Sequence, residues 1–200
     1  MDFFDFENEP TVCAYCGKKI NCNCEIKDIK MGNEKSFFES TKHFKMGKNF
    51  EDRLKVLFKE RGFEVQESTE EENKFKHIDF YVKGTDGGRY SIDAKAMKSV
   101  DHGQTYQDVY TYIEFKNVRG NPGWIYGEVD FFAFERKSSI IIISQKNLLA
   151  FSLSKVDLNK RVYRLEDAHY KVYGRPSRKD LFSLIKLDDL PKDKIKVFNF

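Results

Sequence analysis

The sequence predicts an α/β fold in which a mixed central β-sheet is flanked by helices. Residues 48–61 repeat apolar side chains at helical spacing, residues 77–95 alternate like two strands joined by a turn, and residues 140–143 are four consecutive isoleucines. The chain has 200 residues, of which 40% are hydrophobic and 19 are Phe. That is enough to bury the core of one compact domain with a small appendage.

The appendage is expected at residues 1–46, ahead of a core domain at residues 47–200. Residues 1–17 carry four acidic residues and no Lys or Arg, which favours a flexible acidic arm. Residues 25–46 are polar with scattered Phe, and are interpreted as a linker or a short helix lying over the core.

All four cysteines fall within one twelve-residue segment of this appendage, as Cys13, Cys16, Cys22 and Cys24. Scattered structural disulfides do not cluster in this way, and no secretion signal pattern precedes the segment. Two thiolate pairs so close together suit a tetrahedral structural Zn2+ site. A reduced loop without metal and a redox role are the alternatives.

The first helix is expected at residues 48–61. Its apolar residues recur at i, i+4, i+7 and i+8 and form one stripe: Phe50, Leu54, Leu57 and Phe58. Gly62 follows in the position typical of a helix C-terminal cap. Glu51 lies beside the stripe in the first turn, where a carboxylate also suits the helix dipole. A strand should begin at residues 63–65, and a charged loop should follow at residues 67–74.

Two short strands joined by an Asp-Gly turn are expected next, one carrying Asp79 and the other Asp93 and Lys95. Because side chains alternate along a strand, Asp93 and Lys95 share one face, and Ile92 and Ala94 share the other. A carboxylate and an ammonium group side by side, with apolar residues behind them, suit the binding of a divalent cation together with a phosphate.

These residues resemble the signature of the PD-(D/E)XK nuclease superfamily: Asp79, a short spacer, and then Asp93-Ala94-Lys95. The resemblance covers roughly residues 47–134, and Ile78 stands where the family usually has a proline. It implies a restriction-endonuclease-like fold and phosphodiester hydrolysis that depends on Mg2+ or Mn2+. Asp79 and Asp93 would then be metal ligands, Lys95 would hold or activate the attacking water, and Glu51 would complete the metal shell directly or through water. The alternative is a strand face bearing ordinary surface ion pairs.

Later elements follow from the same patterns. Residues 96–109 are expected to form a loop or a short helix, residues 110–118 a strand, and residues 119–123 a loop rich in Gly and Pro. Residues 124–134 are a further apolar segment, and the four isoleucines predict a central strand buried on both faces. A helix at residues 145–158 and a strand at residues 181–187 complete the core. His77, Gln104, Gln107, Glu114 and Trp124 are secondary candidates for the site, each with an ordinary structural role as the alternative.

The C-terminal part of the core is basic. From residue 151 onward there are twelve Lys and Arg against seven Asp and Glu, a net charge of +5. Basic residues interleaved with tyrosines suit a surface that follows a nucleic-acid backbone. The candidate nucleic-acid-binding residues are Lys160, Arg161, Arg164, Arg175, Arg178 and Lys179. A mixed-charge surface without a ligand is the alternative.

Together these features predict a Mg2+-dependent nuclease, acting on DNA ahead of RNA and expected to be an endodeoxyribonuclease. A second hypothesis is a non-catalytic nucleic-acid-binding or inhibitor protein that keeps a nuclease fold, with the acidic arm docking on a phage or mobile-element partner. A homodimer is compatible with either. No run of 18 apolar residues is present, so no membrane span is expected, and the acidic N-terminus favours a cytoplasmic protein.

Overall fold

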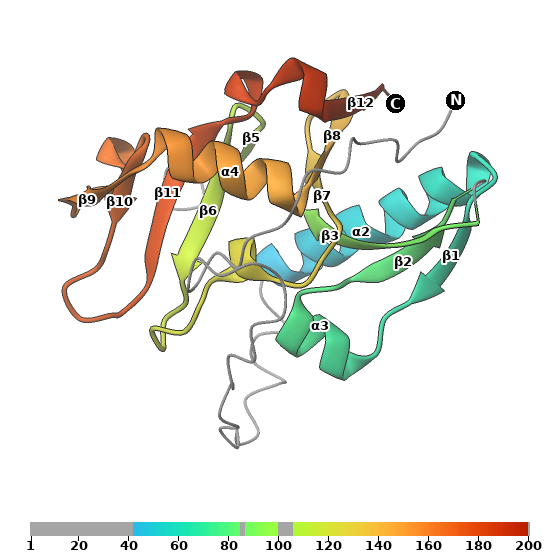
Figure 1. The fold of residues 1–200 in the computed structure, drawn as a ribbon, viewed down its shortest axis with the longest axis horizontal. Coiled ribbons are helices and arrows are strands. Elements are labelled where there is room, and N and C mark those ends of the chain that lie inside the picture. The colour runs from blue at the N-terminus through green and yellow to red at the C-terminus, as the bar shows by residue number, and fades with distance from the viewer. Residues whose placement is uncertain (1–41, 85–86, 100–105, 200) are drawn as a thin grey trace.

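The computed structural model describes residues 42–84, 87–99 and 106–199, which form an α/β fold with mixed sheets and few helices (Figure 1). The predicted α/β class is therefore confirmed. The acidic arm and the cysteine segment lie outside the described residues. Within those ranges, no helix combines the length and the apolar character that crossing a membrane requires.

The main sheet has six strands in the order β1-β2-β3-β7-β8-β12. They are β1 (Glu64–Glu67), β2 (Phe80–Lys83), β3 (Arg89–Lys95), β7 (Phe131–Glu135), β8 (Ser139–Ser144) and β12 (Ile195–Asn199). All neighbours are antiparallel except β3 and β7, which run parallel. The predicted hairpin is the β2–β3 pair, and the four isoleucines lie in β8, between two other strands.

Helix α2 (Lys42–Glu60) covers one face of the main sheet. Phe50, Leu54 and Phe58, members of the predicted stripe, are buried there in one cluster with Ile92 of β3 and Ala133 of β7. The helix begins six residues before the predicted Lys48, so the boundary placed between residues 46 and 47 falls inside it. Gly47 costs helix stability of about 1 kcal/mol, which is too little to stop a helix held by packing.

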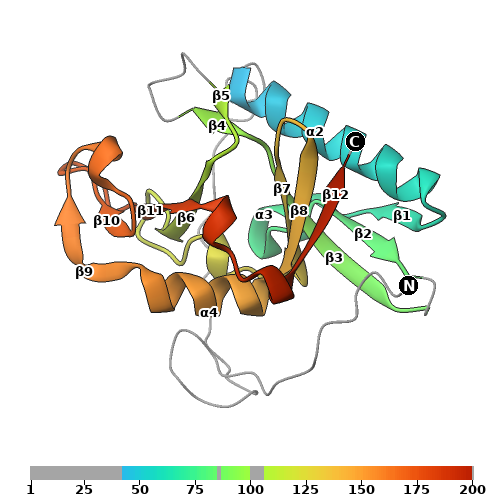
Figure 2. The ribbon, with the colours of Figure 1, turned by 90° about the horizontal axis from the view of Figure 1, so that it is seen from above.

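Helix α4 (Gln145–Lys155) covers the opposite face, as Figure 2 shows with the main-sheet strands between α2 and α4. Phe132, Phe134, Ile141 and Ile143 point to this side, in a second core cluster. Because Ile92 and Ala94 belong to the α2 side, the alternation along β3 sends Asp93 and Lys95 to the α4 side. The two faces of β3 are therefore divided as predicted.

A second sheet lies beside the main one on this α4 side, with strand order β6-β11-β10-β9 (Figures 1 and 2). Its strands are β6 (Tyr110–Lys116), β9 (Asp157–Val162), β10 (Lys171–Tyr173) and β11 (Leu181–Lys186). Ile113 and Ile185 bury one of its faces in the same cluster as Phe132. The two sheets share a core, which brings the second sheet close to Lys95.

Two predicted segments differ from the structure, and three strands were not predicted. The expected charged loop at residues 67–74 contains helix α3 (Glu70–Lys76), which begins with a capping box between Thr69 and Glu72. The expected loop or helix at residues 96–109 contains the small antiparallel pair β4 (Lys98–Ser99) and β5 (Tyr106–Gln107). Strands β9, β10 and β12 were not anticipated.

Candidate active site

The site forms where β2 begins and β3 ends. Phe80 pairs with Ile92 in antiparallel register, and the Asp79 N–H donates to the Ile92 carbonyl at 2.9 Å. Asp79 directly precedes this pair and Asp93 directly follows Ile92, so the two aspartates are neighbours at the end of the ladder. Directly opposed residues of an antiparallel pair point to the same side of the sheet, so the hairpin itself places the two carboxylates together.

Neighbouring groups fix both carboxylates. The Asp79 carboxylate accepts from Asn73 Nδ2 on α3 and from the Ala94 N–H, each at 2.7 Å. Asp93 is only 2% exposed and lies within hydrogen-bonding reach of the Asp79 carboxyl. Lys95 Nζ is 2.6 Å from Asp93 Oδ2, yet this oxygen receives no hydrogen bond of good geometry from the described residues.

Two carboxyl groups thus share the positive charge of one lysine. Burial, together with the nearby charge of Asp93, raises the pKa of Asp79 to about 7, although Lys95 and the Ala94 N–H act in the opposite direction. Burial also raises the pKa of Asp93, opposed chiefly by Lys95. The pair is short of positive charge, and either a proton or a cation would relieve the repulsion.

Lys95 lies against the second sheet. Its Nζ is 4.6 Å from the centre of the Trp124 ring, in the short 3-10 helix Trp124–Tyr126. Trp124 in turn donates its backbone N–H to the Glu114 carboxylate on β6, whose pKa is raised by burial. Gly123 allows this approach, since a Cβ there would lie 2.1 Å from the Glu114 carbonyl oxygen. Glu114 and Trp124, secondary candidates in the sequence, therefore belong to the surroundings of Lys95.

Two further basic side chains lie near the carboxylates. His77 ends α3 in a left-handed conformation with φ 59°, and burial and Lys95 lower its pKa to about 4, so its imidazole is neutral at pH 7. Burial and Lys95 also lower the pKa of Lys98, while Asp93 raises it. Lys98 and Asn73 were not singled out in the sequence, because neither belongs to a recognisable spacing.

Glu51 does not join the two aspartates in a compact cluster. It extends from α2, the helix on the other face of the main sheet, and its carboxylate lies 2.8 Å from Lys48 Nζ and 2.6 Å from Lys55 Nζ. Its charge still contributes to the raised pKa of Asp79. Among the described residues, no three His, Cys, Asp or Glu side chains gather closely enough to hold a metal ion by themselves.

Two polar residues considered in the sequence have structural roles. The Gln107 side chain donates to the Lys98 and Tyr110 carbonyls and accepts from the Val109 and Tyr110 N–H groups, which fastens β5 to β6. Gln104 lies outside the described residues.

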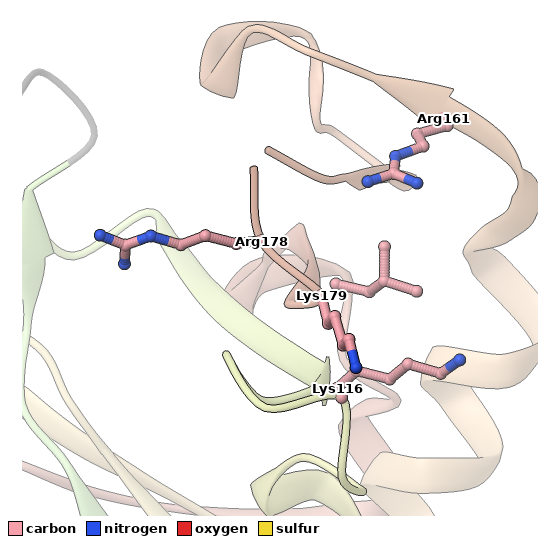
Figure 3. A pocket seen from close by; sticks show the side chains of 6 residues that line it. Lys116, Arg161, Arg178 and Lys179 are labelled. Atoms are coloured by element: carbon pink, nitrogen blue, oxygen red, sulfur yellow. The ribbon is translucent and has the colours of Figure 1, made fainter. Parts of the chain in front are cut away.

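The six candidate nucleic-acid-binding residues separate into two groups. Arg161, Arg178 and Lys179 line one pocket together with Lys116, as Figure 3 shows. The other three lie outside that pocket: Arg164 pairs with Glu166, Arg175 pairs with Asp180, and Lys160 is an exposed residue of β9.

Arg175 is therefore expected to support the fold. Asp180 is 3% exposed, Arg175 pairs with its Oδ2, and its Oδ1 is buried without a hydrogen-bond partner among the described residues. Arg175→Ala would leave this carboxylate without its cation, so we expect the free energy of unfolding to fall by about 3 kcal/mol in urea denaturation. Arg164→Ala, which removes an exposed pair, should leave the urea midpoint unchanged. Equal midpoints for the two variants would contradict the assignment.

Comparison of the chain with protein-family models, with curated proteins and with solved structures finds no match.

Proposed function

We propose that this protein is a metal-dependent nuclease that hydrolyses phosphodiester bonds, with DNA ahead of RNA as its substrate. One observation carries the proposal: Asp79 and Asp93 lie side by side where β2 begins and β3 ends, with Lys95 Nζ at 2.6 Å from Asp93 Oδ2.

The donor set fits a divalent cation. Two neighbouring carboxylates with raised pKa values, one of them with a poorly satisfied buried oxygen, gain from a hard cation that prefers oxygen ligands. Asp79 and Asp93 would hold Mg2+ or Mn2+, with the Ala94 carbonyl as a further ligand. The bound ion would supply charge neutralisation at the phosphate and a more acidic water.

The protein's own groups then have separate tasks. The Lys95 ammonium would hold the attacking water or a phosphate oxygen, since it is the cation closest to both carboxylates. Asn73 and the Ala94 N–H keep the Asp79 carboxylate in place. Trp124 closes one side of the Lys95 ammonium and limits its motion. Glu51 acts from a distance, through its charge or a bridging water.

The arrangement also supports a restriction-endonuclease-like reading of the fold. Helix α2 precedes a three-stranded antiparallel unit, β1-β2-β3, and β7 extends it in parallel on the far side of β3. Asp79 directly precedes β2, and Asp93 and Lys95 lie in the adjoining strand β3, in the chain order that the resemblance implies.

The test combines cleavage with metal binding. We expect plasmid and linear DNA to be cleaved in Mg2+ or Mn2+ and left intact in EDTA, with RNA as the comparison substrate. In a Mn2+ titration, Asp93→Asn should weaken binding by about tenfold or more, because a neutral amide cannot balance the cation's charge. Asp52→Asn is the matched control, since it removes one exposed carboxylate from α2. The proposal fails if no divalent metal supports cleavage of any nucleic acid.

A second candidate is a non-catalytic protein that binds nucleic acid or a partner. The position of Glu51 favours it, because Lys48 and Lys55 occupy the carboxylate that would complete a metal shell. If Asp93→Asn leaves both nucleic-acid binding and the protein's biological effect unchanged, this candidate replaces the nuclease. The structural Zn2+ site, a homodimer, a phage or mobile-element partner and a cytoplasmic location stay predictions of the sequence.

A further inference from the structure

We propose that a pocket at the edge of the second sheet binds a phosphate group of a nucleic-acid strand, away from the Asp79–Asp93 site. The basic pocket is lined by Lys116, Gly120, Arg161, Arg178, Lys179 and Leu181 and has a volume of about 320 Å³. The inference rests on the proposed function only in taking nucleic acid as the source of the phosphate.

Separate segments of the chain build this pocket. Lys116 ends β6 and pairs with Leu181 at the start of β11, which places the preceding Arg178 and Lys179 next to β6. Arg161 comes from β9, at the other side of the sheet. Figure 3 shows Arg161, Lys116 and Lys179 arriving from different segments, while Arg178 extends on another side.

Two glycines make room for the cationic side chains. Gly174 lies against Arg161, since a Cβ at position 174 would be 2.5 Å from Arg161 Nε. Gly120 has φ +86°, and a Cβ there would be 3.0 Å from Lys179 Cδ. Backbone therefore supports the guanidinium and the lysine stem directly. The close backbone therefore limits how far the side chains of Arg161 and Lys179 can move.

The pocket gathers positive charge without a matching anion. In the described ranges none of Lys116, Arg161, Arg178 and Lys179 forms an ion pair, and no acidic residue lines the pocket. The neighbouring Asp180 carboxylate is buried and taken by Arg175. Arg161 also stacks near the Tyr163 ring at 5.7 Å, which leaves its donors available. Several like charges gathered around one pocket favour an anionic ligand.

A phosphate fits this chemistry better than other ligands. One guanidinium group can donate to two phosphate oxygens at once, and a lysine adds a compact positive charge. Leu181 is the only large apolar residue of the lining, so the pocket offers little to an apolar ligand. Strand β6 passes both the pocket and the surroundings of Lys95. Lys116 lies on the same face of β6 as Glu114, about 7 Å further along the strand. Glu114 contacts Trp124 beside Lys95. We therefore expect one nucleic-acid strand to reach both the basic pocket and the candidate site.

The test measures binding without metal, so that it does not depend on cleavage. A short single-stranded oligonucleotide labelled at its 3′ end is titrated in EDTA with wild type and with Arg161→Ala/Lys179→Ala. We expect the Kd to rise by about tenfold or more, and the salt slope to fall by about 1.4, the value for two lost phosphate contacts on a single strand. Lys59→Ala/Lys137→Ala removes the same charge from two exposed positions outside the pocket. It should change the Kd by less than about threefold.

Failure of the pocket proposal can be distinguished from failure of the nuclease proposal. Equal losses in the two double variants, or no loss in the first, overturn the pocket whether or not the protein cleaves DNA. Selective loss in the first double variant supports the pocket even if the nuclease proposal fails. Oligonucleotides with 5′-phosphate and 5′-hydroxyl ends then identify the source. A preference for the phosphorylated end that is lost in Arg161→Ala/Lys179→Ala indicates a terminal phosphate, and equal affinity indicates an internal one.

Discussion

Replacing Lys95 with alanine is expected to reduce phosphodiester cleavage by about 10²- to 10³-fold or more, because it removes the ammonium group that forms an ion pair with Asp93. Two consequences follow from one substitution. The attacking water and the phosphate lose a positive partner. Asp93, already buried, loses the charge that opposes the rise of its pKa, so a larger fraction is protonated and unable to hold a metal.

The measurement is the initial rate of plasmid cleavage at saturating Mg2+, alongside DNA affinity in EDTA. Lys83→Ala is the matched control, because it removes an exposed lysine from the same hairpin and should retain wild-type cleavage. A circular dichroism spectrum like that of wild type separates lost chemistry from lost fold. Wild-type cleavage by Lys95→Ala would mean that Asp79, Asp93 and Lys95 are an ordinary ion-pair cluster.

Asp79→Asn is expected to stabilise the metal-free protein while it abolishes cleavage. The folded-state pKa of Asp79 is about 7, against an ordinary value of 3.8, so the folded protein keeps a proton that the unfolded chain has lost between these pH values. The contribution of Asp79 to stability is therefore highest below about pH 4 and declines until about pH 7. At pH 8 the buried negative charge of Asp79 opposes folding, and the substitution by asparagine removes that charge.

We expect the gain in the free energy of unfolding to be about 2 kcal/mol at pH 8. The advantage over wild type should shrink steadily on lowering the pH toward 4. Asparagine can still accept from the Ala94 N–H, and the Asn73 amide can reverse to pair with it. Urea denaturation in EDTA at both pH values checks this. Mn2+ should stabilise wild type and not the variant, and a variant less stable than wild type at pH 8 would contradict the prediction.

Local patterns predicted much of the fold. The Asp-Gly turn between alternating segments yields the β2–β3 pair, the isoleucine run yields β8, and the Phe50–Phe58 stripe yields α2. Helix α3 was missed, although Thr69 and Glu72 form a capping box, because the charged segment has no apolar stripe. Strand β9 could not be found by alternation, since residues 157–160 are all exposed, including the apolar Leu158. Its parallel pairing with β10 is set by tertiary packing.

The part of the site that lies on the β2–β3 hairpin could be predicted from the sequence. Asp79, Asp93 and Lys95 share a face because strand periodicity requires it. The position of Glu51 depends on which face of the sheet α2 covers, and no local pattern carries that information. The ion pair between Arg175 and Asp180 was likewise missed, since a loop must fold back to form it. Lys116 lines the basic pocket because β6 pairs with β11, and the spacing of residues in the sequence does not reveal this pairing.

Trp124 is the only tryptophan of the chain, and its ring lies 4.6 Å from the Lys95 ammonium. All indole fluorescence of this protein therefore originates beside the candidate site. A cation that draws Asp93 away from Lys95, or a phosphate that draws Lys95 away from the ring, changes the charge next to the fluorophore. The unlabelled protein consequently carries a built-in optical reporter of events at these carboxylates, with no background from other indoles to subtract.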